Sequence, residues 1–190
     1  MRDDAILHIG QYAEGSGKLE TGSQANLSID AEFRKINARI HSAGHLLDVA
    51  MNRAGRTDLK PSKGYHFESG PYVEYIGVVP ADERAPLAAE LAKHCADLIA
   101  EATAAKTKVI SKICSYHDAQ DELKGAGGVP SYIPMGQDLR VLKLVPEDPG
   151  CPCGGTHVDS ISKIGRIEIT KIKKKKKNTQ VSYKVTPIDF

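Results

Sequence analysis

Two short motifs of histidine and cysteine constrain this chain more than any other feature. His41 and His45 lie four positions apart in HSAGHLL, within a stretch whose apolar residues recur at helical spacing. Positions i and i+4 of a helix lie on one face, so both imidazoles can reach one ion. The second motif is CPCGGTH, where two glycines let the backbone fold back between Cys153 and His157. Each motif therefore supplies two side chains that can point at a single centre.

Together the two motifs provide three imidazole nitrogens and one thiolate, a donor set that suits tetrahedral zinc. Either motif alone has a plain structural explanation, but their combination predicts one Zn²⁺ held by His41, His45, Cys153 and His157. Cys151 is a rival thiolate, although the CxxxH spacing favours Cys153. The metalloprotease signature HExxH is absent because Ser42 takes the place of its glutamate, which disfavours peptide cleavage by that mechanism.

The remaining sequence predicts an α+β domain. Asp30 is a good N-cap for a helix over 31–54, and a second helix is expected from about 82 or 86 to 106. Strands are expected in a hairpin over 64–79 and at four later places, 108–114, 140–145, 164–172 and 180–186. This order favours a two-layer structure, an antiparallel sheet with helices on one face, rather than alternating parallel units.

The 190 residues divide into two unequal parts in this interpretation. Residues 5–29 read as a strand, a turn and a strand, so we expect 1–29 to be an N-terminal strand pair, the remnant of a larger N-terminal domain. Residues 30–190 are expected to form the zinc-binding domain. A strand pair alone cannot build a core, so it needs the main domain or a missing neighbour to pack against.

Charge is concentrated in one place. The net charge is +2, yet segment 171–177 alone carries six lysines. Five of them, 173–177, are expected at the tip of the last hairpin, where a charge run is either a solvated turn or a contact for a phosphate backbone. Both readings stay open. The candidate RNA contacts are Lys171, Lys173, Lys174, Lys175, Lys176 and Lys177.

Several function classes are disfavoured by composition. No apolar run is long enough for a membrane helix, and the first residues, MRDDAILHIGQY, lack the layout of a signal peptide. We therefore expect a reducing cytoplasm and no disulfides. The loop GAGGVPSYIPMGQ lacks phosphate-loop spacing, so no nucleotide cofactor is expected; it is either a lid or a surface connection. With no Trp and few Phe and Tyr, a base-stacking surface has little to work with.

HSAGHLL followed about a hundred residues later by CGGTHV resembles the editing domain of alanyl-tRNA synthetase, and most closely its freestanding AlaX-type relatives. SKGYHF resembles the family's strand after the first helix, and the segment from 158 to 185 resembles its closing hairpin. The resemblance implies the editing-domain fold shared by threonyl- and alanyl-tRNA synthetases. It also implies zinc on His41, His45, Cys153 and His157.

The activity implied by the resemblance is ATP-independent hydrolysis, in trans, of serine or glycine wrongly esterified to tRNA(Ala). The partner would be mischarged tRNA, and the role would be translation fidelity in protein biosynthesis. Ser62 stands about where the family often has a glutamine. It joins the candidate substrate contacts, which are Ser42, Ser62, Gly154, Gly155 and Thr156. No separate general base is evident, and no catalytic residue is assigned beyond the zinc site.

Two alternatives remain beside the trans-acting hydrolase. Four protein ligands would close a structural zinc site, whereas catalytic zinc keeps an open position. The chain could accordingly be a non-catalytic, zinc-stabilised module that binds RNA or a protein. It could also be the editing fragment of a larger alanyl-tRNA synthetase. The sequence leaves open the preference between serine and glycine, the oligomeric state and the coordination number of the ion.

Overall fold

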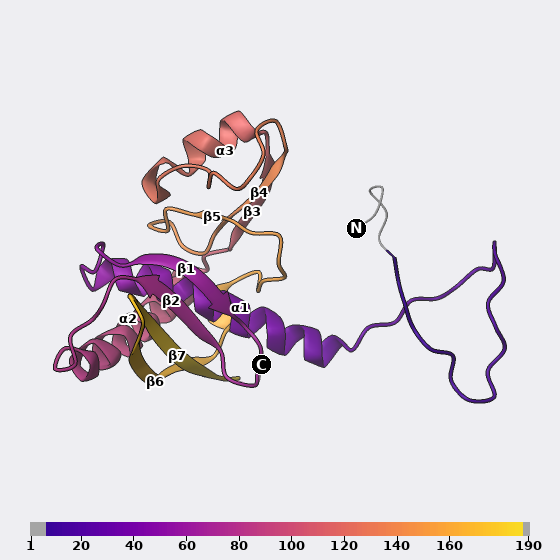
Figure 1. Cartoon of the computed structure of the whole chain (residues 1–190), viewed down its shortest axis with the longest axis horizontal. Helices are drawn as coiled ribbons and strands as arrows, with labels where there is room; N and C mark the ends of the chain where they lie inside the picture. Colours follow the sequence, from indigo (N-terminus) through magenta and orange to yellow (C-terminus); the bar gives the residue numbers. More distant parts are fainter. Residues whose placement is uncertain (1–6, 188–190) are drawn as a thin grey trace.

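The computed structural model describes residues 7–187 and divides their strands between two antiparallel sheets (Figure 1). The larger sheet has the strand order β1-β2-β7-β6 and the smaller has the order β3-β4-β5. The sheet strands are β1 (Lys60–Tyr65), β2 (Tyr72–Ile76), β3 (Ile110–Cys114), β4 (Leu139–Lys143), β5 (Cys151–Pro152), β6 (Arg166–Lys175) and β7 (Asn178–Thr186). The α+β class with antiparallel sheets is confirmed, although the sequence did not separate the two sheets.

The long helices form where the apolar spacing predicted them. Helix α1 (Ala31–Arg53) begins at Asp30, whose side chain accepts a hydrogen bond from the Phe33 amide at 2.9 Å. Helix α2 (Arg84–Ala104) buries one stripe made of Leu87, Leu91, Cys95, Leu98 and Ala102. The shorter helices are α3 (Tyr116–Glu122), η1 (Lys124–Ala126) and η2 (Ile161–Lys163). Within residues 7–187, no helix is long and apolar enough to cross a membrane.

Helices α1 and α2 pack on one face of the four-stranded sheet, and the main core lies between them. Leu46 and Leu47 of α1 and Leu91 of α2 are fully buried there with Tyr75 of β2. Burial of each such side chain contributes about 1.5–3 kcal/mol to folding. The core therefore fixes α1, and with it His41, against the sheet.

The smaller sheet builds a second core with α3, and Figure 1 shows this unit standing beside the four-stranded sheet. Strand β4 joins the two cores because its side chains alternate. Leu139 and Val141 face α3, whereas Leu142 reaches the main core. Strand β5 pairs with β4, and the loop that carries the second motif follows at once. This placement brings Cys153 over α1.

Two expectations about strands were wrong. Among residues 7–29 there are turns but no strand, and apolar side chains such as Ile9 and Leu27 are 94% and 83% exposed. The reason is that no sheet edge or helix covers them; residues 5 and 6 lie outside the described part. The lysine run is also not simply a hairpin tip. β6 extends through Lys175, and only Lys176 and Lys177 form the turn, Lys176 with a positive φ of 58°.

Candidate metal centre

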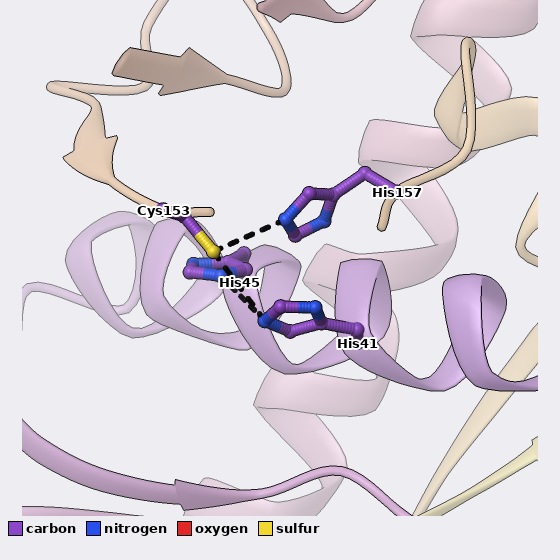
Figure 2. Close-up of side chains that lie close together, drawn as sticks. All are labelled: His41, His45, Cys153 and His157. Atoms are coloured by element: carbon purple, nitrogen blue, oxygen red, sulfur yellow. Dashed lines mark hydrogen bonds between the residues drawn. The ribbon is translucent and has the colours of Figure 1, made fainter. Parts of the chain in front are cut away.

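The four side chains predicted as zinc ligands meet between α1 and the loop after β5 (Figure 2). One ligand atom from each of His41, His45, Cys153 and His157 lies within 4.8 Å of the others. Three of the separations are 3.2 Å between the Nε2 atoms of His41 and His45, 3.6 Å from Cys153 Sγ to His41 Nε2, and 3.3 Å from Cys153 Sγ to His157 Nε2. Residues far apart in the chain thus converge on one point.

Three of the six separations match the edges of a coordination tetrahedron, and all six lie within 4.8 Å. With Zn–N near 2.0–2.1 Å and Zn–S near 2.3 Å, tetrahedral ligand atoms stand about 3.3 Å apart for N–N and about 3.6 Å for N–S. The observed values of 3.2, 3.6 and 3.3 Å agree with this to within a few tenths of an ångström. The donor set and its spacing therefore fit a single zinc ion.

Each of the three histidines is held by its second ring nitrogen. His41 hydrogen-bonds to the backbone of Thr156, which leaves its Nε2 directed at Cys153. His45 Nδ1 lies 3.3 Å from Cys151 Sγ. His157 Nδ1 lies 3.3 Å from the Ser42 hydroxyl. Such partners fix the tautomer and the orientation of a metal-binding imidazole.

The protonation of the histidines also suits a cation. Burial lowers the pKa of His41, His45 and His157, that of His157 to about 3, so all three imidazoles are neutral near pH 7. The Nε2 atoms of His41 and His45 lie 3.2 Å apart. Neutral imidazoles offer lone pairs to a cation, so these four side chains could hold a metal ion.

Cys151 lies beside this centre without joining the four-atom cluster. Its sulfur contacts the outer nitrogen of His45, and burial raises the pKa of the thiol. The geometry accordingly gives Cys151 the position of a hydrogen-bond partner for a ligand, whereas Cys153 takes the position of a ligand. Cys95 and Cys114 are buried in the two cores, as expected of small apolar side chains.

The loop Cys153–His157 is tied down from the neighbouring strand. Arg140 of β4 donates hydrogen bonds to the carbonyls of Gly154 and Gly155. At Gly155 a Cβ atom would lie 2.2 Å from Cε1 of His41, so any larger residue would displace that ring. The two glycines and Arg140 therefore hold the loop in shape against α1. The carbonyl oxygens of both glycines already accept hydrogen bonds from Arg140.

The predicted substrate contacts occupy different places. Ser42 is fully buried and accepts a hydrogen bond from the Val158 amide, so it lies behind His157. Ser62 lines a pocket of about 550 Å³ that borders the metal centre at His45 and Cys151. Gly154, Gly155 and Thr156 are absent from the walls of this pocket as described, and they lie instead around His41 and Arg140.

The pocket has three further features that sequence reasoning did not assign. His66 stacks on His41 with ring centroids 4.8 Å apart, and its Nδ1 donates to the Tyr183 hydroxyl at 2.8 Å, since that hydroxyl itself donates to the Ile40 carbonyl. Asp48 lies one helical turn after His45 and accepts from the Tyr75 hydroxyl. The loop GAGGVPSYIPMGQ supplies part of the pocket wall.

His66 could have been found from its position two residues after Gly64 in SKGYHF, but only contact with α1 distinguishes it from an incidental histidine. Burial and the neighbouring His41 lower its pKa to about 4. The ring is therefore neutral, and with a proton on Nδ1 its Nε2 is a hydrogen-bond acceptor.

Comparison with known proteins agrees with this geometry. Residues 139–180 match the family "Threonyl and Alanyl tRNA synthetase second additional domain". The chain is 29% identical over 166 residues to an alanine–tRNA ligase of Sorangium cellulosum, covering 87% of this chain and 17% of the ligase. It is 31% identical over 174 residues to the alanine–tRNA ligase of Jannaschia sp., an alignment that covers 86% of this chain and 19% of that ligase. It is 29% identical over 178 residues to the alanine–tRNA ligase of Rhizobium meliloti, which covers 86% of this chain and 18% of that ligase.

The chain thus spans less than one fifth of the length of these relatives. Within that share the similarity runs over most of the chain, and the family match covers β4, β5, the loop with Cys153 and His157, and most of the final hairpin. The resemblance inferred from the two motifs is confirmed. This chain is related to the second additional domain of threonyl- and alanyl-tRNA synthetases.

Proposed function

We propose that this relative of the synthetase second additional domain is a zinc-dependent hydrolase that removes serine or glycine from mischarged tRNA(Ala), acting in trans in the cytoplasm. The observation that carries the proposal is the convergence of His41, His45, Cys153 and His157, whose ligand atoms lie within 4.8 Å of one another, beside a pocket. The similarity to alanine–tRNA ligases supports the choice of tRNA as partner.

The reaction needs little beyond binding and placement. An aminoacyl ester is already activated, and water attacks its carbonyl carbon to release the free amino acid and the ribose hydroxyl of the tRNA. Zinc, when bound to the three imidazoles and Cys153, supplies a Lewis acid and a template. The chain's own task is to hold the ester and one water in register, which by itself contributes a large share of such rate enhancements.

The pocket residues suit that task. A volume of about 550 Å³ accommodates an aminoacyl group with its ribose. Nε2 of His66 is an acceptor available to a water or to the substrate's ammonium group, and the Asp48 carboxyl and the Ser62 hydroxyl add polar groups to the same wall. A site that hydrogen-bonds the serine hydroxyl would leave polar groups unpaired when alanine enters, which would spare correctly charged tRNA.

Two observations support other candidates. The four protein donors would fill a tetrahedral shell, as in a structural zinc site, and this favours a non-catalytic module that binds RNA or protein. The relatives are several times longer than this chain, which favours an editing segment of a larger synthetase. Hydrolysis in trans requires instead that zinc take a fifth ligand, or that one of the four donors yield its place.

The deciding experiment measures initial rates of deacylation of Ser-, Gly- and Ala-tRNA(Ala) by the zinc-loaded chain. The proposal expects turnover of the serine or glycine ester, little of the alanine ester, and loss of turnover on chelation that zinc restores. Chelation that unfolds the domain, with no turnover at any zinc concentration, would support the non-catalytic module. Turnover only when the chain is joined to synthetase domains would support the editing segment.

A further inference from the structure

The face of the four-stranded sheet opposite α1 and α2 carries an unusual set of side chains. On β2, Val73 and Tyr75 point into the core, so alternation directs Tyr72 to the other side. The register places Tyr65 opposite Tyr72. On β6, Ile172 is buried in the core, which directs its neighbours Lys171 and Lys173 outward. We call the outer face the set Lys63, Tyr65, Phe67, Tyr72, Lys171, Lys173 and Lys175.

Aromatic rings form a short stack at one end of the outer face. The rings of Tyr65 and Tyr72 lie 5.7 Å apart between centroids and are nearly parallel, with an interplanar angle of 15°. Phe67 lies 5.1 Å from Tyr65 at a tilt of 56°. Tyr65 is 36% exposed and Phe67 55% exposed. Three of the chain's ten Phe and Tyr residues thus gather here, in a chain that is poor in aromatic residues.

Positive charge lies alongside the rings. Lys175 Nζ stands 5.4 Å from the centroid of the Tyr72 ring and also pairs with Glu74, which accounts for the buried carboxylate on this side. Across the part of the chain that the structure describes, Lys63, Lys171 and Lys173 have no acidic partner within ion-pair distance. Lys63 shares β1 with Tyr65, whereas Lys171 and Lys173 lie on β6, which β7 separates from β2. Lysines without an acidic partner on the same sheet face as exposed rings attract a polyanion that also has planar groups.

The stack lies next to the metal centre in the chain. His66 stands between Tyr65 and Phe67 in sequence, and its ring stacks on His41 while its two neighbours contact each other. The end of β1 therefore contacts the candidate metal centre through His66 and carries the exposed rings of Tyr65 and Phe67 on either side of that residue in sequence.

We propose that the outer face binds single-stranded RNA, with unpaired bases stacking on Tyr65 and Phe67 and phosphates lying along the lysines of β6. Bases within a duplex already stack on one another, so exposed rings favour unpaired nucleotides. Identifying this RNA as the unpaired end of a tRNA rests on the proposed function. The binding itself rests on the rings and the lysines alone.

The test measures binding of a short, fluorescent, single-stranded oligo(A) and of an RNA duplex by anisotropy, with the zinc-loaded chain over a range of salt concentrations. Tyr65→Ala and Phe67→Ala are each expected to weaken oligo(A) binding about five- to 100-fold. Tyr12→Ala is the matched control, because Tyr12 is 54% exposed and belongs to segment 7–29, which precedes the domain. Tyr65→Phe keeps the ring and should restore most of the affinity.

Three results would overturn the proposal. One is equal affinity for oligo(A) and the duplex; another is an equal effect of Tyr65→Ala and Tyr12→Ala. The third is a concentration-dependent dimer that Phe67→Ala dissociates, which would assign the face to a second copy of the chain. Because the probe carries no amino acid, its binding is measured separately from hydrolysis. Oligo(A) binding that depends on Tyr65, without deacylation, would reject only the proposed function. Deacylation together with oligo(A) binding that Tyr65→Ala does not change would reject only RNA binding by the outer face.

Discussion

Replacing Gly44 by alanine tests how tightly His66 is packed against α1. Alanine is normally the more stable choice in a helix interior, by about 0.8–1.0 kcal/mol. Here, however, the new Cβ would lie 2.3 Å from Cε1 and 2.6 Å from Nδ1 of His66, and 3.0 Å from the Tyr183 hydroxyl. Non-bonded carbons are comfortable at about 3.5–4.0 Å, so the His66 ring must move by about 1 Å or more.

The size of the effect follows from what that movement breaks. The 2.8 Å hydrogen bond between His66 Nδ1 and Tyr183 would be lost. Leaving a half-buried donor unpaired costs about 1–3 kcal/mol. The loss outweighs the gain in helix propensity, so Gly44→Ala should lower the free energy of unfolding by about 0–2 kcal/mol.

The assay is a double-mutant cycle on the free energy of unfolding, measured by denaturant titration of zinc-loaded protein. In a His66→Ala background the clash with the ring disappears and only the 3.0 Å contact with the Tyr183 hydroxyl remains, so Gly44→Ala should then stabilise the domain by up to about 1 kcal/mol. The sign of the Gly44→Ala effect therefore reverses between the two backgrounds. If alanine at position 44 stabilises both backgrounds equally, the close contact between His66 and α1 is wrong.

Three further predictions concern neighbouring parts of the molecule. Ser42→Ala removes the hydroxyl beside His157 Nδ1 and should weaken zinc binding about 10- to 100-fold in a competition titration, whereas a structural role alone would change only stability. Replacing Lys173–Lys177 by serine should weaken tRNA binding and reduce the log–log salt slope by about 0.7–0.9 for each phosphate that the variant no longer neutralises; an unchanged slope would make the run a bystander. Burial raises the pKa of Asp48 from 3.8 to about 7, so the folded state binds the proton more tightly and this group's contribution to stability falls as pH rises between those values. The free energy of unfolding, measured from pH 4 to 7, should fall less with pH in Asp48→Asn than in wild type, and parallel curves for the two proteins would contradict this prediction.

Local signals made the two long helices and the ligand set predictable. Asp30 and the apolar spacing of α1 set the helix start and its buried face, and the i, i+4 rule then placed His41 and His45 together. The strand pair expected over 5–29 does not form within the described residues 7–29, because alternating apolar residues form strands only where a sheet edge covers them. Ile9 is 94% exposed.

The surroundings of the ligands could not be read from spacing. Cys151 and Ser42 reach His45 and His157 only after the loop from β5 closes over α1. His66 depends in the same way on the packing of β1 beside Gly44, a contact between segments about 20 residues apart. Such contacts arise from tertiary packing, and no fixed spacing along the sequence predicts them.

The central claim is that one zinc ion is held by four residues, with Cys153 as its thiolate and Cys151 outside the coordination shell. The most direct measurement is the zinc-to-protein ratio of wild type, Cys153→Ser and Cys151→Ser after dialysis against a weak chelator. Serine removes the thiolate ligand at position 153 but keeps a hydrogen-bond acceptor for His45 at position 151. The account predicts about one zinc per chain in wild type and Cys151→Ser, and little in Cys153→Ser. Equal retention in both variants, or loss in Cys151→Ser alone, would contradict it.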